Sequence, residues 1–448
     1  MSKKIISFRF VLLNFITYYI IRKNYKFKGM IKIKEVFEKY ESNVRSYCRK
    51  WPVEFVSAKG SICKDVDGNE YLDFFDGAGA LNYGHNPDYI KQKLIDYLEK
   101  DGIMHALDMY TLPKEKFISY LEEKILKPRN LDYKIAFPGP TGTNSIELAL
   151  KLARKVKQRS YIWGFTGAFH GMTLGALALT TEEAARKAAG VPLQYTVHIP
   201  APYSMGGNFN TIGYMEELLT NDHSGYEKPA AIIIETVQQE GGIHVFSKDF
   251  LKDLRAFCNK YDILLICDEV QIGCSRSGTF FSFERADIIP DIVCMSKSIG
   301  GYGLPFAITL FKRELDEFKP GEHNGTFRGA QLSMVAALAA LELTVEQDIP
   351  NQVKEKEKIV EEFLNKEIKP LLKENMEIRG IGLTWGIEFN DGKLSRKVLD
   401  KCFEKKMIIE LAGSSDSVLK IMPSLVIEKD LLLKGLNIIK ESIQEVLK

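Results

Sequence analysis

The feature that most constrains the fold is the alternation, through the middle of the chain, of short apolar runs with amphipathic helical stretches. Residues 231–236 (AIIIET), 263–267 (ILLIC) and 292–295 (IVCM) are rich in β-branched and aliphatic side chains, as buried strands are. Between the first two runs, residues 248–261 carry apolar side chains at helical spacing, namely Phe250, Leu251, Leu254 and Phe257. A strand, a crossover helix and a second strand form a parallel pair, so the pattern predicts an α/β fold with a mainly parallel central sheet.

The pattern changes after residue 345. A long charged helix is predicted over residues 352–372, strands over 383–389 and 419–422, and a terminal helix from Lys429. We therefore expect a large domain of residues 86–345 and a smaller α/β domain formed by residues 346–448 together with residues 30–85. A chain of 448 residues with 45% hydrophobic content is long enough to bury a core in each.

Residues 1–29 differ from the rest of the chain. Residues 5–21 are largely apolar, but Arg9 and Asn14 interrupt the run, which falls short of the roughly 20 apolar residues that a membrane-spanning helix needs. No small-residue cleavage site follows. We expect an N-terminal extension outside the fold, with the functional start near Met30 and a membrane anchor as the alternative.

Charge and cysteine content narrow the classes of function. The 61 basic and 59 acidic residues give a net charge of +2, too small to attract nucleic acid or an anionic membrane surface, so small molecules are the expected partners. The seven cysteines include no C-x-x-C pair and two lie in apolar runs, which favours a reducing cytoplasm over a disulfide framework. No metal site is expected, because zinc-binding spacings are missing from the sequence.

A glycine-containing turn precedes one predicted helix. Residues 139–144 (GPTGTN) come before a helical pattern over residues 145–157, with Glu147 in its first turn. The free N–H groups and the positive dipole end at such a helix start suit a phosphate group. Many helices begin after a glycine without binding any ligand, so this pattern alone leaves the phosphate site open.

Two ionisable residues end apolar runs of the predicted sheet. Asp268 follows residues 263–267, and Lys297 follows residues 292–295 at the edge where parallel sheets bind ligands. A lysine at that depth can lose its proton by desolvation and act as a Schiff-base nucleophile, although most lysines are surface charges. A buried aspartate needs a cation, such as a protonated pyridine ring. With the phosphate turn, the two residues predict pyridoxal 5′-phosphate (PLP) as the cofactor.

The motifs around these residues resemble those of the class III aminotransferases, the ω-aminotransferase branch of fold type I PLP enzymes. The resemblance runs from about Val36 to the C-terminus and is carried by residues 169–171 (FHG), 235–242 (ETVQQEGG), 268–271 (DEVQ), 296–298 (SKS) and 325–329 (GTFRG). It implies an aminotransferase of PLP fold type I in which Lys297 and Asp268 are the catalytic residues.

The resemblance also implies the remaining contacts with the cofactor. Gly142 and Thr143 correspond to phosphate ligands, and Gln271 to a partner of the ring hydroxyl. Phe169 corresponds to the ring that stacks on the pyridine, with His170 beside it, although a core phenylalanine is the alternative for Phe169.

Residues from two subunits are implied at each site. Thr326 corresponds to the residue that reaches the phosphate of the neighbouring subunit, which implies a homodimer or a dimer of dimers. Glu240, the second glutamate of ETVQQEGG, pairs with an arginine in many family members, and Lys420 stands in that position here. A lysine can replace the arginine only as a monodentate partner of Glu240. The expected substrate-binding residues are Glu240, Lys420 and Arg328. The alternative for Lys420 is a surface charge.

Four further stretches are similar to one branch of the family, which exchanges an amino group between L-glutamate and L-aspartate 4-semialdehyde. They are residues 37–52, 77–85, 137–144 and 296–305. Another ω-aminotransferase, acting on ornithine, 4-aminobutyrate or a carrier-linked substrate, is an alternative. A PLP-dependent aminomutase and a non-catalytic binding module are two others.

Overall fold

The computed structural model describes residues 33–448, and the chain divides into two units, residues 1–53 and residues 54–448. In the first unit lie helices α2 (Ile33–Tyr40) and α3 (Tyr47–Lys50). The predictions made for residues 1–29 lie outside the described residues. Between residues 33 and 448, no helix has the length and apolar character needed to cross a membrane.

A seven-stranded sheet forms the centre of the second unit. Its order is β4 (Tyr133–Ala136), β12 (Ile308–Lys312), β11 (Ile292–Met295), β10 (Leu264–Asp268), β7 (Ala231–Ile234), β5 (Ile162–Phe165) and β6 (Thr196–Ile199). Only β12 within this sheet is antiparallel to its neighbours. The three strands predicted from their apolar runs, β7, β10 and β11, are adjacent and parallel, so the predicted α/β fold with a mainly parallel sheet is confirmed.

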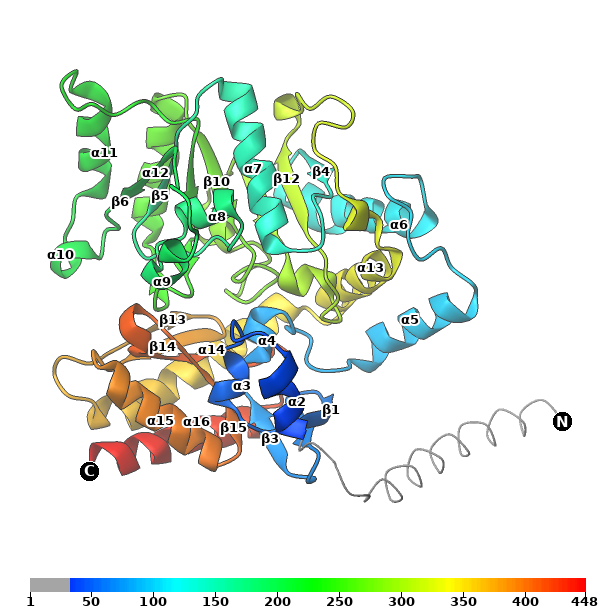
Figure 1. Ribbon diagram of the computed structural model, residues 1–448, viewed down its shortest axis with the longest axis vertical. Helices are drawn as coiled ribbons and strands as arrows, with labels where there is room; N and C mark the ends of the chain where they lie inside the picture. Colours follow the sequence, from blue (N-terminus) through cyan, green and yellow to red (C-terminus); the bar gives the residue numbers. More distant parts are fainter. Residues whose placement is uncertain (1–32) are drawn as a thin grey trace, which may run out of the picture. The chain divides into compact units, whose positions relative to one another are not determined.

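Side chains of the central strands alternate between two apolar layers, as the two-residue period of a strand requires. Ile233, Ile266 and Cys294 pack in the layer of helix α7 (Gly142–Lys157), whereas Ile232 and Leu265 pack in the layer of helix α12 (Lys248–Lys260). Figure 1 shows both helices running alongside the strands. Burial of each aliphatic side chain contributes about 1.5–3 kcal/mol to the stability of the fold. The sheet is therefore a stable support for the groups at its edge.

Two four-stranded sheets lie in the same unit, besides a two-stranded one formed by β8 (Val237–Gln238) and β9 (His244–Val245). One has the order β1 (Phe55–Lys59), β2 (Ile62–Asp65), β3 (Glu70–Asp73) and β15 (Met407–Ile408), with β15 parallel to β3. The other is antiparallel, in the order β13 (Glu377–Ile381), β14 (Thr384–Glu388), β17 (Val418–Ile421) and β16 (Glu410–Ala412). Leu72 and Phe74 share one apolar core with residues far along the chain, such as Met407 and Leu419. The domain boundaries predicted at residues 85 and 345 stay predictions.

The C-terminal helices α14 (Ile349–Phe363), α15 (Gly392–Glu404) and α16 (Lys429–Leu447) pack in that core. The helix predicted over residues 352–372 is α14, continued by a π-helical turn (Leu364–Ile368) and a 3-10 turn (Lys369–Leu371). Pro370 in the last turn lacks an N–H donor, which explains why the α-helical pattern does not extend through it.

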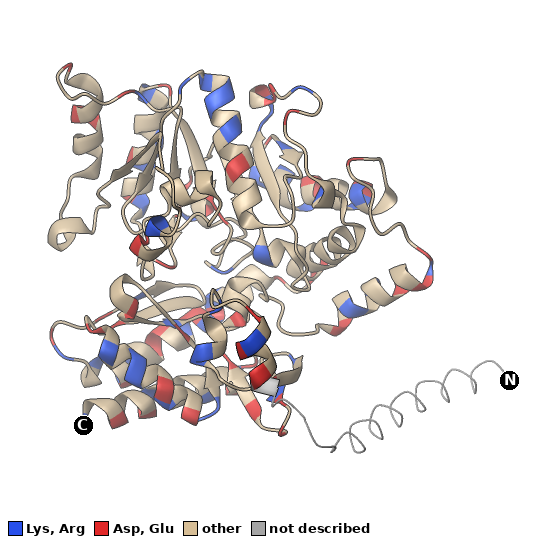
Figure 2. Cartoon of the chain, viewed as in Figure 1, with Lys and Arg blue, Asp and Glu red and all other residues tan. Residues whose placement is uncertain are grey.

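The remaining elements connect these layers. They are α4 (Asp76–Gly79), α5 (Asp88–Glu99), α6 (Leu112–Tyr120), α8 (Leu174–Leu179), α9 (Glu183–Lys187), α10 (Ser204–Gly207), α11 (Thr211–Thr220) and α13 (Gln331–Glu346). Figure 2 shows Lys and Arg interspersed with Asp and Glu along the helices, in keeping with the small net charge of +2.

Candidate active site

Polar residues gather where the three central parallel strands end. Glu235 follows β7, Asp268 is the last residue of β10, and Lys297 follows β11 by two residues. Because adjacent parallel strands end at the same edge of a sheet, these residues share one site. Asp268 and Lys297 were singled out from the sequence, and Glu235 begins the family motif of residues 235–242.

Asp268 is hydrogen-bonded to His170. The Nδ1 atom of His170 lies 2.7 Å from Oδ2 of Asp268, and both side chains are at least 95% buried. Asp268 Oδ1 accepts a second hydrogen bond, from the Val270 N–H at 3.0 Å. Burial alone would lower the pKa of His170, but the hydrogen bond and charge of Asp268 raise it above its ordinary value. The structure thus places the predicted cofactor-site residue His170 on the aspartate.

Glu235 is a buried carboxyl group that orients the neighbouring loop. It accepts hydrogen bonds from the N–H groups of Phe169 at 3.0 Å and Gln239 at 3.2 Å. Burial, reinforced by the charge of Asp268, raises the pKa of Glu235 to about 7, although His170 acts in the opposite direction. Phe169 is thereby fixed through its backbone, next to His170, and its ring is half-buried.

Lys297 has an unusual backbone conformation and a side chain that is not hydrogen-bonded to any described residue. Its backbone is in the left-handed region with a φ of 52°, which is uncommon for a non-glycine residue and is found at functional sites. Within residues 33–448 its ammonium group makes no hydrogen bond or ion pair. Burial lowers the pKa of Lys297 to about 8, with the Lys420 charge acting in the same direction and Glu240 opposing it. The unprotonated fraction of the amine near neutral pH is therefore larger than for an ordinary lysine, which favours a nucleophilic role.

Helix α7 begins at Gly142, three residues before the predicted start. Thr141 and Asn144 form part of a capping box, in which Asn144 Oδ1 accepts from the Thr141 N–H at 3.2 Å and from Thr141 Oγ1 at 2.7 Å. In the part of the chain that the structure describes, the N–H groups of Gly142 and Thr143 have no hydrogen-bond partner. A Cβ on Gly142 would lie 2.7 Å from Val270, so only glycine fits there. The start of this helix can accept an anion.

Lys420 lies in a second buried cluster. Its ammonium group donates to Glu240 Oε1 at 2.7 Å, to Gln271 Oε1 at 2.9 Å and to Glu410 Oε2 at 3.3 Å. Gln271 in turn donates to Glu240 at 3.2 Å and to the Ala78 carbonyl at 3.0 Å. Lys420 is fully buried, so it is not a surface charge. Glu410 was not predicted from the sequence.

The charged groups of this cluster shift one another's pKa values. Burial alone would raise the pKa of Glu240, but Lys420 and Lys297 lower it to about 2. Burial alone would lower the pKa of Lys420, whereas Glu240 and Glu410 raise it. Glu240 and Lys420 are therefore both charged at neutral pH.

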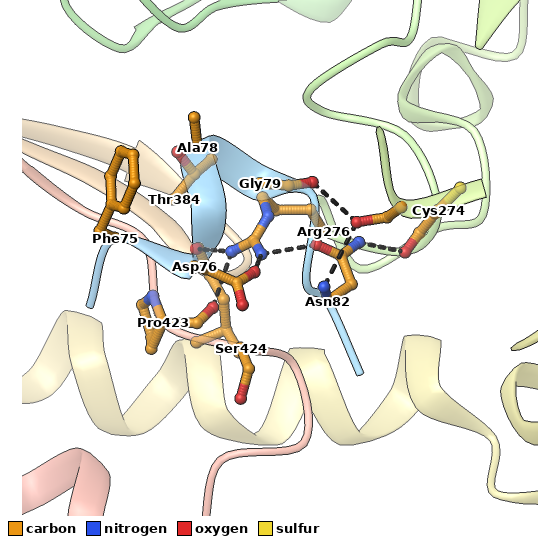
Figure 3. Close-up of polar contacts among 12 residues, drawn as sticks. Phe75, Asp76, Ala78, Gly79, Asn82, Cys274, Arg276, Thr384, Pro423 and Ser424 are labelled. Carbon is orange, nitrogen blue, oxygen red and sulfur yellow. Dashed lines mark hydrogen bonds and ion pairs between the residues drawn. The ribbon is translucent and has the colours of Figure 1, made fainter. Parts of the chain in front are cut away.

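Arg276 was also not predicted from the sequence. It forms hydrogen bonds with segments that are distant from it in the chain. Its guanidinium is fully buried and contacts Asp76 Oδ2, Asn82 Oδ1 at 2.6 Å, and the carbonyls of Leu383 and Pro423, both at 2.8 Å. Figure 3 shows Asp76, Asn82 and Pro423 around the Arg276 guanidinium, each contributed by a different part of the chain from Arg276 itself.

Asn82 extends this network to the residue that follows Lys297. Its side chain donates to the Cys274 carbonyl at 2.9 Å, and its backbone N–H donates to Ser298 Oγ at 3.3 Å. Ser298 Oγ donates to the Gly79 carbonyl at 2.7 Å. The backbone on which Lys297 stands is therefore held by hydrogen bonds from the segment around residues 79–82.

Thr326 and Arg328 lie apart from these contacts. Thr326 is exposed, and Arg328 forms an ion pair with Asp108 and donates to the His323 carbonyl at 3.1 Å. Neither makes a hydrogen bond or ion pair, in the described part of the chain, with Lys297 or with the Lys420 cluster.

Among residues 33–448, one group of potential metal ligands occurs elsewhere. Cys63, Asp73 and His85 place one ligand atom each within 4.8 Å of one another. His85 Nε2 lies 2.7 Å from Asp73 Oδ2 and 3.4 Å from Cys63 Sγ. Burial and the charge of Asp73 raise the pKa of the Cys63 thiol to about 12. The contacts are those of a His–Asp hydrogen bond beside a thiol.

Comparison with known proteins gives one consistent family. The family model for class III aminotransferases matches residues 46–443. A diaminobutyrate–2-oxoglutarate transaminase of Oceanobacillus iheyensis is 48% identical over 412 residues, which cover 92% of this chain and 96% of that protein. A relative of the same name from Nocardia farcinica is 50% identical over 413 residues, covering 92% and 94% of the two chains.

Solved structures share the fold. An ornithine aminotransferase of Toxoplasma gondii, described as having partial occupancy of PLP at its active site, superimposes with a TM-score of 0.81 at 24% identity. The superposition covers 96% of this chain and 97% of that one. A Bacillus anthracis aminotransferase gives a TM-score of 0.81 at 25% identity, covering 93% of this chain and all of that one.

Proposed function

The chain belongs to the class III aminotransferases, a family of PLP-dependent enzymes, and on that basis we propose that it forms L-2,4-diaminobutyrate and 2-oxoglutarate from L-aspartate 4-semialdehyde and L-glutamate. The reaction is reversible and runs in two half-reactions. The observation that carries the proposal is the similarity, at close to half identity over more than nine-tenths of each chain, to relatives named diaminobutyrate–2-oxoglutarate transaminase.

The residues present fit PLP in charge and in space. The N–H groups at the start of α7 and the absence of a side chain at Gly142 suit a phosphate, with Gly142 and Thr143 as its ligands. Asp268 offers a buried carboxylate to the ring nitrogen, and Lys297 offers an unpaired amine. Phe169 would stack on the ring, and Gln271 would contact its hydroxyl.

When bound, PLP supplies an aldehyde that bonds to amines and a protonated ring that withdraws electrons from the reacting carbon. Lys297 holds the cofactor through its amine and afterwards acts as the general base and acid, moving a proton on and off the substrate carbon. Asp268 keeps the ring nitrogen protonated, and His170 positions Asp268 through the 2.7 Å hydrogen bond. Glu240 and Lys420 contact the substrate end that lies farther from the reacting carbon, with Arg328 as a further candidate.

A homodimer is part of the proposal. Residues 104–107 run beside residues 329–331, where Gln331 donates to the Met104 carbonyl and Ala106 donates to that of Gly329. Apolar side chains on both segments are exposed, namely Ile103, Met104, Leu107, Met109, Tyr110, Leu112 and Phe327. Exposed apolar side chains on and beside two paired segments favour a protein–protein interface, and Phe327 follows Thr326, which would reach the phosphate of the neighbouring subunit. Light scattering of the purified protein tests the dimer.

We place the enzyme in the cytoplasm, because all seven cysteines are free and six of them are buried. Fractionation of cells that express the full chain tests this location.

The substrate proposal is tested with a panel of amino donors. Purified, PLP-loaded enzyme is incubated with 2-oxoglutarate and with diaminobutyrate, ornithine or 4-aminobutyrate, and glutamate formation is measured. We expect the highest specificity constant with diaminobutyrate. A higher value with ornithine or 4-aminobutyrate would assign the enzyme to another ω-aminotransferase, and product formation without any 2-oxoacid would indicate an aminomutase.

A further inference from the structure

Glu410 and Lys420 face each other across two strands. β16 and β17 are antiparallel, and their register pairs Glu410 directly with Lys420. Directly opposed side chains lie on the same face of a sheet, within reach of each other. On the other side of Lys420, β14 presents Gly386, which has no side chain. Glu410 is therefore the cross-strand neighbour whose side chain meets Lys420.

The hydrogen-bonding capacity of Lys420 is fully used. An ammonium group has three N–H donors, and here Glu240, Gln271 and Glu410 supply three acceptors. A substrate carboxylate can bind Lys420 only by displacing one of them. The Glu240 side chain is 31% exposed, whereas that of Glu410 is 3% exposed and lies within a strand. Glu240 is thus the acceptor that can leave, and Glu410 is the one that stays.

The cluster also carries an excess of negative charge. Two carboxylates surround one ammonium, so the group has a net charge of −1 while Glu240 remains bound. These charges act close to the reacting end of the site, because the pKa of Lys297 responds to Glu240, Lys420 and Glu410.

The two amino donors of the proposed reaction differ in the charge that they bring to this cluster. Diaminobutyrate reacting through its γ-amine carries an ammonium and a carboxylate at its other end. Glutamate reacting through its α-amine carries only a carboxylate there. An anionic pocket wall attracts the first and opposes the second.

We propose that Glu410 is a positioning residue that sets substrate preference: it anchors Lys420 and keeps the pocket anionic, favouring the donor with a distal ammonium over the dicarboxylate. This inference rests on the proposed function. When glutamate binds, its carboxylate takes the place of Glu240 on Lys420, and Glu410 keeps the lysine in position. When diaminobutyrate binds, both glutamates stay and their excess charge faces the ammonium.

Glu410→Gln tests the charge without removing the hydrogen-bond acceptor. The two half-reactions are measured separately, with diaminobutyrate and with glutamate. We expect the ratio of their specificity constants, diaminobutyrate over glutamate, to fall at least about tenfold in the variant. Glu410→Asp, which restores the charge, should keep the ratio within roughly threefold of the wild type.

The matched control is Glu388→Gln. Glu388 lies on β14 of the same sheet and is ion-paired with Arg379 at 3.0 Å, not with Lys420. In this variant, the ratio of the specificity constants for diaminobutyrate and glutamate should not change. If Glu410 has only a structural role, Glu410→Gln should lower the specificity constants of both half-reactions by the same factor. That result, which leaves their ratio unchanged, overturns the inference. If the glutamine variant does not fold, Glu410→Ser, which leaves space for water beside the ammonium, carries the same expected fall.

A binding measurement separates this inference from the proposed function. Glutarate, a dicarboxylate without an amine, is titrated into the PLP-loaded wild type and Glu410→Gln by calorimetry. We expect glutarate to bind at least about fivefold more tightly to the variant. If the wild type does not use diaminobutyrate, the proposed function fails, but tighter glutarate binding still supports the charge role of Glu410. Equal or weaker binding overturns it.

Discussion

The Nδ1 atom of His170 lies 2.7 Å from Oδ2 of Asp268, and this buried pair stands where the central strand β10 ends. A carboxylate can only accept a hydrogen bond, so His170 is the donor. With the Val270 N–H on its other oxygen, both carboxyl oxygens of Asp268 are hydrogen-bonded. The protein thus holds this side chain in a fixed position for a cationic ring nitrogen.

Asp268→Asn should fold and still bind PLP, but transaminate several orders of magnitude more slowly. A neutral amide cannot keep the ring nitrogen protonated, so the ring no longer absorbs electrons efficiently. The visible spectrum of the purified variant reports PLP binding, and single-turnover kinetics with glutamate report the rate. Activity within about tenfold of the wild type, or about 1.4 kcal/mol, would contradict the role of Asp268.

His170→Gln should lose stability in a pH-dependent way. The pKa of His170 is raised in the folded protein, so its stabilising contribution is fully present below the unfolded pKa of about 6.5 and is lost as pH rises through the folded value. The difference in unfolding free energy between wild type and variant should therefore be largest at acidic pH and shrink as pH increases. Urea unfolding at a series of pH values measures it; a difference that grows with pH would show that His170 is neutral in the folded state.

Arg276→Met should destabilise the protein by about 3–5 kcal/mol, because it leaves the buried Asp76 carboxylate without its cation. The control is Arg313→Met, which breaks the exposed ion pair with Asp132 and should leave stability nearly unchanged. Urea unfolding compares both with the wild type. Equal midpoints for the two variants would mean that the Arg276 network does not support the fold.

The central sheet could be predicted from the sequence because each of its main strands is marked by a continuous apolar run. The runs that became β7, β10 and β11 are continuous and apolar, and the positions of Asp268 and Lys297 follow from where those runs end. The start of α7 was placed three residues late, although the capping-box residues Thr141 and Asn144 were a readable signal.

Arg276 and Glu410 were missed for different reasons. Arg276 stands among serines and glycines, as an exposed loop residue does, and its burial depends on carbonyls more than 100 residues away. No local pattern reports such partners. Glu410 carried a signal, since it interrupts the apolar run of residues 407–412. A charge in a buried strand requires a partner, but only the register of β16 and β17 identifies it as Lys420.

Lys297→Ala should abolish transamination and leave the fold intact. The fold should survive because the Lys297 ammonium makes no hydrogen bond or ion pair within the described residues. After borohydride reduction, mass spectrometry should find PLP covalently attached to the peptide of Lys297 in the wild type and to no peptide in the variant. Lys366→Ala, at an exposed lysine, is the control and should keep its activity. Attachment to another lysine would overturn the assignment.

Lys420→Met tests whether the buried lysine binds the carboxylate of a substrate. Methionine keeps the length of the side chain but leaves Glu240 and Glu410 without the ammonium between them. A dicarboxylate then meets only negative charge, so the specificity constant for the glutamate half-reaction should fall at least about tenfold. PLP binding should persist, because the predicted phosphate contacts lie at α7 and the ring-nitrogen partner Asp268 lies on β10. Gln271, the predicted partner of the ring hydroxyl, loses its bond to Lys420 but keeps its bond to the Ala78 carbonyl. Separate half-reaction kinetics and the visible spectrum measure the two effects.

If neither half-reaction changes, Lys420 has no role in binding, and Arg328 becomes the next candidate. Arg328 would then have to release Asp108 to reach a substrate, so exchanging Asp108 for asparagine should strengthen glutamate binding in that case alone.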